Sequence, residues 1–172
     1  MSFLGKLFGR KQDDRDVARP LWHRTVEIAR EKEWYRDCGV ADTVGGRFDM
    51  ITLILSIVLI RMERDADLIA PSVRLTELFV DDMDGQLRES GVGDVVVGKR
   101  MGQLMSVLGG RLGAYREGLA PGNEALMAEA VTRNVNLHDG TDPLLVARRA
   151  RAFAAGLDLV PAYRVLDAEI GK

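Results

Sequence analysis

Acidic side chains cluster between residues 77 and 94. This stretch holds six acids and one base, a local charge of −5 in a chain whose net charge is −2. In a helix, residues three and four apart lie on the same face, so several of these charges would form one surface. That surface fits three roles: solvated exterior, internal pairing across the following turn, or docking of a basic partner. The candidate partner-binding residues are Glu77, Asp81, Asp84, Arg88, Lys99 and Arg100.

Residues that usually bind metals or perform catalysis are few. The chain has one cysteine, Cys38, and two histidines, His23 and His138, which is too few for a structural zinc site. A single cysteine excludes an intramolecular disulfide and is typical of a reducing compartment. The sequence contains neither of the Glu-x-x-His and His-Glu-x-x-His patterns of helical metal sites. We therefore expect a protein that is not an enzyme, with no metal and no cofactor.

Two short motifs were compared with known ligand-binding loops: the calcium loop and the phosphate-binding loop. Neither motif matches. The segment Asp82-Met83-Asp84-Gly85 lacks the further oxygen ligands of a calcium loop. The loop that contains Gly91, Gly93 and Asp94 follows a predicted helix rather than a strand, and its spacing is not that of a phosphate-binding fingerprint. Gly91 is better explained as the residue that ends the helix in the left-handed conformation.

Two segments are locally basic. Residues 148–151 are either solvated helix surface or a contact for RNA or lipid phosphate. The N-terminus is interrupted by charges and is therefore not a secretory signal; it either lies on an anionic membrane surface or forms a frayed end. The candidate membrane-surface residues are Phe3, Leu4, Lys6, Leu7, Phe8, Arg10 and Lys11.

The composition indicates a single globular domain. Of 172 residues, 47% are apolar and 29% are charged. We expect a basic amphipathic segment over residues 1–19 and a helical domain over residues 20–172. The net charge of −2 provides no general attraction to nucleic acid and argues against DNA binding. The longest run without a charged residue, Met50–Ile60, is mostly apolar and is shorter than the roughly 20 residues that a membrane span needs.

Helical periodicity runs through almost the whole chain, whereas alternation at period two is not sustained anywhere. This pattern predicts an all-α bundle of six or seven helices around a central apolar helix over about residues 48–64. Ser72 is expected to cap the helix that follows. The expected helices span about 20–36, 48–64, 72–89, 97–119, 123–135, 143–155 and 162–170.

Glycines within the helix at 97–119 predict close packing. Each glycine costs up to about 1 kcal/mol relative to alanine in a helix, and the usual compensation is the close approach of another backbone. The residues concerned are Gly98, Gly102, Gly109, Gly110 and Gly113.

The residues Gly46, Arg47, Phe48 and Asp49 mark the start of the central helix. In the first turn, Asp49 would interact favourably with the helix dipole. Arg47 would reach the acids of the following helix as a bidentate partner. The alternative is that this segment only fixes how the chain begins the helix, because ion pairs of this kind more often set geometry than function.

Three stretches form a combination with a recognisable order and spacing. The first comprises Trp34-Tyr35-Arg36, Gly39-Val40-Ala41-Asp42-Thr43 and Gly46-Arg47-Phe48-Asp49-Met50. The second comprises Leu78-Phe79-Val80-Asp81-Asp82-Met83-Asp84 and Leu87-Arg88-Glu89-Ser90-Gly91-Val92-Gly93-Asp94, and the third Gly98-Lys99-Arg100-Met101 with Tyr115. Together they resemble the ubiquinol–cytochrome c chaperone family, whose members are assembly factors of the cytochrome bc respiratory complex. The resemblance covers roughly residues 20–136.

The resemblance implies a non-catalytic assembly chaperone. Its expected client is newly made cytochrome b or another subunit of the bc complex, bound in the cytoplasm at the inner face of the inner membrane, with peripheral membrane contact. Mitochondrial relatives are linked to the exit region of the ribosome, which leaves a ribosome- or RNA-associated helical adaptor as the alternative. Asp13, Asp14 and Asp16 do not fit a mitochondrial transit peptide, so a bacterial member is expected.

Overall fold

The computed structural model describes residues 17–89 and 97–171, with the side chains of residues 86–89 and 97–101 excepted. These residues form eight α-helices and no strand, and the only extended pairing among them is an isolated antiparallel bridge between Val40 and Leu137. The predicted all-α bundle is confirmed. The helices are α1 (Arg19–Ala29), α2 (Lys32–Arg36), α3 (Val44–Met62), α4 (Ala66–Glu89), α5 (Val97–Leu119), α6 (Glu124–Asn134), α7 (Leu144–Asp158) and α8 (Ala162–Leu166).

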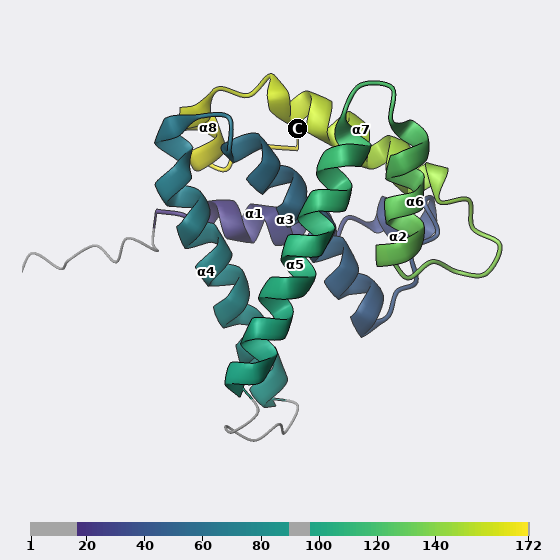
Figure 1. Cartoon of the computed structure of the whole chain (residues 1–172), viewed down its shortest axis with the longest axis horizontal. Helices are drawn as coiled ribbons and strands as arrows, with labels where there is room; N and C mark the ends of the chain where they lie inside the picture. The colour runs from purple at the N-terminus through teal and green to yellow at the C-terminus, as the bar shows by residue number, and fades with distance from the viewer. Residues whose placement is uncertain (1–16, 90–96, 172) are drawn as a thin grey trace, which may run out of the picture.

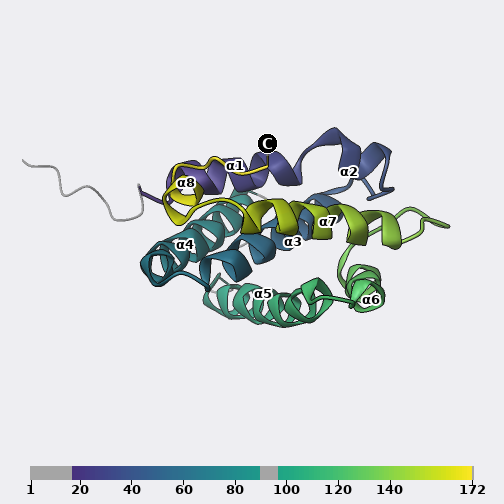
Figure 2. The same ribbon diagram turned by 90° about the horizontal axis from the view of Figure 1, so that it is seen from above.

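Helix α3 is the centre of the bundle. Every residue from Asp49 to Met62 is buried, and the helix contacts α1, α4, α5 and α7. Figure 2 shows α1, α2 and α8 on one side of α3, and α5 and α6 on the other. The apolar character of this helix all round its circumference is therefore matched by neighbours on every side, as predicted for residues 48–64. None of the described helices has the combination of length and apolarity needed to cross a bilayer.

The first predicted helix, residues 20–36, is two helices. Helix α1 ends at Ala29, and the backbone of Glu31 is extended, with φ −56° and ψ 132°. A second short helix, α2, then runs in a new direction (Figure 1). The prediction missed the break because apolar spacing continues across it: Ile28 and Trp34 are both buried, but they lie on different helices.

Two helices begin earlier than predicted. Helix α3 begins at Val44, where the hydroxyl of Thr43 accepts a hydrogen bond from the Gly46 amide at 3.0 Å. Helix α4 begins at Ala66, so the prediction that Ser72 caps it is wrong. Pro71 lies inside α4 and removes only one backbone donor, on a helix with an exposed side. The Ser72 hydroxyl instead donates to the carbonyl of Ile69 at 2.7 Å.

The prediction that glycines within α5 mark close packing is wrong for four of the five glycines named; the fifth, Gly98, lies where the side chains are not described. A Cβ built on Gly102, Gly109, Gly110 or Gly113 would have no neighbouring atom within 4 Å. The close approach in α5 is instead at Gly118, where a Cβ would lie 2.6 Å from the Cα of Met127 in α6. The end of α5, rather than its middle, therefore depends on glycine.

Candidate functional site

The motif segment from residue 34 to residue 50 folds around an open hollow of about 600 Å³. This volume is within the usual range of ligand pockets. Four permanent cations and one carboxylate occur among the side chains that line it, and we call it the cationic hollow. The lining residues are Arg30, Lys32, Tyr35, Arg36, Val40, Asp42, Arg47 and His138.

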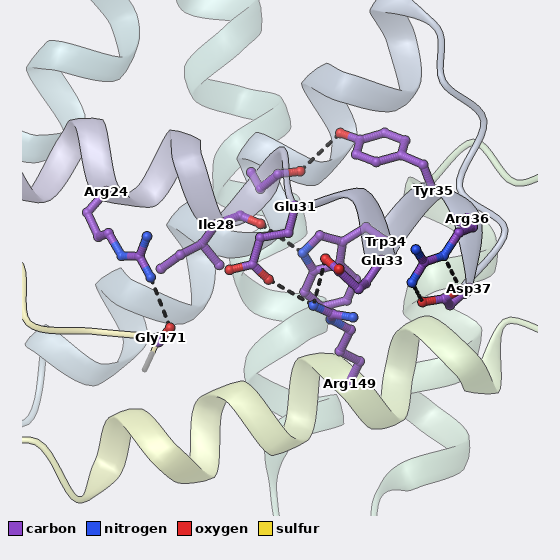
Figure 3. A network of polar contacts seen from close by, with 11 residues as sticks. Arg24, Ile28, Glu31, Glu33, Trp34, Tyr35, Arg36, Asp37, Arg149 and Gly171 are labelled. Atoms are coloured by element: carbon purple, nitrogen blue, oxygen red, sulfur yellow. Dashed lines mark hydrogen bonds and ion pairs between the residues drawn. The ribbon is translucent and has the colours of Figure 1, made fainter.

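The corner between α1 and α2 places two of these cations. The last carbonyl groups of a helix have no partner within the helix and need one from elsewhere. Here the Trp34 indole donates to the carbonyl of Ile28 at 2.8 Å, and the Tyr35 hydroxyl donates to the carbonyl of Ala29 at 3.0 Å (Figure 3). Both bonds fold α2 back onto the end of α1, and residues 30 and 32 therefore lie at the edge of the hollow.

Helix α7 holds α2 from the opposite side. The guanidinium of Arg149 donates to Glu31 at 2.8 Å, and its carbon lies 4.5 Å from the centroid of the Trp34 ring (Figure 3). The same guanidinium lies 3.9 Å from a carboxylate oxygen of Glu33. Stacking on an aromatic face combined with a fork-shaped donor set is particular to arginine. The short helix α2 is therefore fixed by tertiary contacts.

Two backbone hydrogen bonds bring the loop after α6 to the hollow. The amide of His138 donates to the carbonyl of Gly39 at 2.9 Å, and the amide of Ala41 donates to the carbonyl of Asn136, also at 2.9 Å. Gly39 has φ +70°, and a Cβ there would lie 2.5 Å from the side chain of Thr141, so this position needs glycine. The pairing explains how His138, distant in sequence, comes to line the hollow.

Two of the lining arginines have acidic partners on the surface. Arg36 pairs with Asp37 and Arg47 pairs with Asp42, each at 2.7 Å. Hydrogen bonds from these guanidinium groups hold the pKa of both carboxyl groups below the ordinary value. All four side chains are exposed, and exposed pairs are weak, so each arginine can exchange its partner at little cost.

The other two cations of the hollow have no such partner. Neither Arg30 nor Lys32 makes a side-chain hydrogen bond or ion pair with the residues that the structure describes. The half-buried ring of Tyr35 forms part of the wall; burial raises the pKa of its hydroxyl, with a smaller contribution from the carboxylate of Asp42. The hollow therefore has an excess of positive charge next to an aromatic surface.

A second polar cluster lies inside the bundle, between α3 and α5. Asp49 pairs with Arg111 at 2.8 Å and accepts hydrogen bonds from Asn136, from its amide at 3.1 Å and from its side chain at 2.5 Å. Arg111 also donates to the Thr52 hydroxyl at 2.5 Å. The expected interaction of Asp49 with the helix dipole is replaced by these bonds, because α3 begins earlier and Asp49 lies in its second turn.

Two aromatic side chains, Phe48 and Tyr115, lie beside the cluster of Asp49 and Arg111. The guanidinium carbon of Arg111 lies 5.4 Å from the centroid of the Phe48 ring. The hydroxyl of Tyr115 is buried and has no hydrogen-bond partner among the described residues, and burial raises its pKa. The groups of this cluster bond mainly to one another, so the arrangement fixes α5 against α3.

Arg47 does not reach the acids of α4, and that prediction is wrong. It lies in the first turn of α3 and turns back to Asp42 in the preceding loop. Gly46 lies in the same first turn of α3, directly before Arg47. A Cβ on Gly46 would lie 1.9 Å from the carbonyl oxygen of Ala41, so the loop packs directly on the first turn of the helix.

The structure places Glu77, Asp81 and Asp84 together on α4. Glu77 pairs with Arg74, one turn earlier, at 3.0 Å. Asp81 is exposed and the other two acids are half-buried, and all three interact with other groups of the chain. The acidic surface is therefore at least partly paired internally, and its docking role stays a prediction.

Several other predicted residues lie outside the part of the chain that is described. For Arg88, Lys99 and Arg100, this applies to their side chains. The loop residues and the N-terminal segment lie wholly outside it: Gly91, Gly93, Asp94, Phe3, Leu4, Lys6, Leu7, Phe8, Arg10 and Lys11.

The basic stretch at residues 148–151 holds α7 to its neighbours. Arg148 pairs with Glu124 of α6 at 2.6 Å, and Arg149 holds α2 as described above. Arg151 donates to the carbonyl groups of residues 118 and 120, at the end of α5. These contacts account for the three arginines by packing.

The sequence reasoning did not find the cationic hollow. Arg30 and Lys32 stand among the acids Glu31 and Glu33, so the local net charge is small. The available signal was the density of charged residues between positions 30 and 37. The contribution of His138 had no local signal at all, because it depends on the pairing of two distant loops.

Comparison with known proteins agrees with the motif segment and the fold. The family model described as ubiquinol-cytochrome C chaperone matches residues 36–168. A crystal structure of the Cbp3 homolog from Brucella abortus is 29% identical, with a TM-score of 0.82, covering 96% of this chain and 93% of that one. No curated protein matches the chain. The chain belongs to the ubiquinol–cytochrome c chaperone family, and the resemblance inferred from the sequence is confirmed.

Proposed function

We propose that this protein assists assembly of the bc complex by binding newly made cytochrome b. The observation that carries this proposal is membership of the ubiquinol–cytochrome c chaperone family, which supports a chaperone role for the bc complex. The similarity to the Cbp3 homolog extends over nearly the whole chain and supports a role for the complete domain.

The internal chemistry is compatible with a binding function. The buried polar groups Asp49, Arg111 and Thr52 bond to one another across α3 and α5, and they serve to position helices. No group of three or more potential metal ligands occurs in the described part of the chain. We therefore propose that the protein acts through its surfaces and is not an enzyme.

We propose the acids of α4 as the docking surface for the client. Loops of membrane proteins on the cytoplasmic side carry an excess of Lys and Arg. A surface that contains Glu77, Asp81 and Asp84 is complementary in charge to such loops. The proposed place of action is the cytoplasm, at the inner face of the inner membrane, where these loops emerge.

The test of the client is a pull-down of the affinity-tagged protein from membranes of its own host. We expect apo-cytochrome b to be enriched and bc complex levels to fall when the gene is deleted. Enrichment of ribosomes without cytochrome b would support the alternative, a ribosome-associated adaptor. Normal bc complex levels after deletion would contradict the proposed function.

The test of the docking surface is charge reversal with Glu77→Lys and Asp81→Lys. We expect the protein to remain folded, with some loss of stability from the broken pair between Glu77 and Arg74, followed by its melting temperature. We expect weaker binding of cytochrome b, because like charges would then face each other. The matched control is Glu129→Lys with Asp167→Lys, two exposed acids on α6 and after α8 that give the same change of net charge. Equal client binding by both double variants would show that the acids of α4 are only solvated surface.

A further inference from the structure

The cationic hollow combines charges that the bundle does not neutralise. Arg30 and Lys32 have no side-chain partner among the described residues. Arg36 and Arg47 have one carboxylate each, in exposed pairs at 2.7 Å. Four cations around a volume of about 600 Å³ produce a positive potential that attracts an anion from solution.

We propose that the cationic hollow binds a phosphate group, carried either by the headgroup of an anionic lipid or by a free phosphate ion. Guanidinium groups bind phosphate oxygens through parallel hydrogen bonds, and lysine binds them as a point charge. Arg30 and Lys32 provide both kinds of donor at the edge of the hollow. The exposed arginines then provide further donors once their surface pairs open.

The surface pairs favour phosphate over a carboxylate. A single carboxylate can pair with Arg30 and Lys32, but at Arg36 and Arg47 it would only replace Asp37 and Asp42, which are carboxylates themselves. A free phosphate ion carries about −1.5 to −2 charges at neutral pH, like a phosphate monoester, and can bridge the two unpartnered cations and an arginine at once. The phosphodiester of a lipid headgroup carries a single negative charge, and in a vesicle surface several such headgroups lie side by side, so neighbouring headgroups supply the further charge.

An exposed apolar side chain next to the hollow makes the lipid headgroup a realistic carrier. Val44 lies between the lining residues Asp42 and Arg47 in sequence and is 87% exposed. Membrane-surface segments combine cations with exposed apolar side chains, and Val44 supplies one such side chain beside the hollow. The hollow would repel the basic loops of a membrane-protein client, so this inference is independent of the proposed docking surface on α4.

The test compares the wild-type protein with Arg30→Ala, Lys32→Ala. Both side chains are exposed and make no described bond, so the fold is expected to be retained. One arm measures flotation with vesicles of equal parts phosphatidylglycerol and phosphatidylcholine, against vesicles of phosphatidylcholine alone. The other arm follows the amide signals of residues 30–47 by NMR during titration with inorganic phosphate. The control is Arg116→Ala, Arg133→Ala, which removes the same charge from α5 and α6.

In the lipid arm, we expect Arg30→Ala, Lys32→Ala to weaken vesicle binding roughly 30-fold and the control to change it little. The reason is that each basic residue near an anionic surface contributes about a fivefold factor in affinity. If free phosphate is the ligand, phosphate shifts the amide signals in the wild type only, and flotation does not distinguish the variants. Equal behaviour of both double variants in both arms would overturn the proposal. Binding of a single-stranded RNA oligonucleotide alone would also overturn it.

Discussion

Two ion pairs whose acids, Asp42 and Asp49, both lie on the motif segment have opposite environments. Asp49 and Arg111 are 5% and 14% exposed, and they lie between two helices of the core. Asp42 and Arg47 are each 57% exposed, and they lie at the edge of the cationic hollow. Both pairs have nearly the same separation, 2.8 Å and 2.7 Å. Distance alone therefore does not tell which pair matters for folding.

Burial determines what each pair does. A buried charge that loses its partner is strongly unfavourable, whereas an exposed charge is solvated by water. The buried pair of Asp49 and Arg111, the inner pair, therefore fixes α5 against α3. The exposed pair of Asp42 and Arg47, the outer pair, leaves its arginine available to another anion. Arg149, at 31% exposure, is intermediate between them. The three arginines form a series in which the effect of mutation on stability should fall as exposure rises.

The largest effect is expected for Asp49→Ala. This change leaves Arg111 buried without its carboxylate and removes the acceptor of two hydrogen bonds from Asn136. We expect a loss of about 3–5 kcal/mol in the free energy of unfolding, measured by urea denaturation. The double change Asp49→Leu, Arg111→Met should recover part of the loss, because no charge then remains buried. A loss below about 1 kcal/mol for the single change would show that the inner pair is effectively solvated.

The next effect is expected for Gly46→Ala, which tests the packing of the preceding loop on the first turn of α3. A Cβ at this position would meet the Ala41 carbonyl oxygen at 1.9 Å, and the backbone would have to move. We expect destabilisation of about 1–3 kcal/mol by thermal unfolding.

The control for this change is Gly109→Ala, where a Cβ meets nothing within 4 Å. Alanine is the better helix former, so this variant should be as stable as wild type or more stable by up to about 1 kcal/mol. If both variants had the same stability, the loop would not pack on the first turn of α3 as described.

A smaller effect is expected for Arg149→Ala. The variant loses the bond to Glu31 and the stacking on Trp34, and we expect a loss of about 1–2 kcal/mol. Arg149→Lys should restore only part of it, because lysine lacks the planar fork. Full restoration by lysine, measured by the same urea denaturation, would mean that only the charge of residue 149 matters.

The smallest effect on stability is expected for Arg47→Ala. Near neutral pH, the midpoint of urea unfolding should fall only slightly, because the pair with Asp42 is exposed and its contribution to stability is small. In the wild type, Arg47 lowers the pKa of Asp42, so the pair contributes stability above the ordinary pKa of the carboxyl and loses it as the pH falls through the lowered value.

The measurement is an NMR titration of the Asp42 carboxyl carbon. In Arg47→Ala we expect its pKa to rise towards the ordinary value, and the contribution to acid stability to disappear. An unchanged pKa would mean that other groups of the hollow, and not Arg47, lower the pKa of Asp42.

The sequence by itself determined the class of fold and the family. Apolar spacing identified the central helix, because residues 50–60 carry no charge and present apolar side chains all round the helix. The motif segment identified the family, which comparison confirmed. It also brought Arg47 and Asp49 to attention, although their predicted partners were wrong.

Only the tertiary structure decided which charges meet and which stay apart. Asp49 bonds to Arg111 and Asn136, which are distant from it in the sequence. His138 reaches the hollow through backbone pairing with Gly39. Such contacts depend on how the helices pack, and the spacing of residues along the chain does not predict that packing. The same reason explains the error over the α5 glycines: whether a glycine is covered depends on a neighbouring helix, and α6 reaches Gly118 but not Gly109.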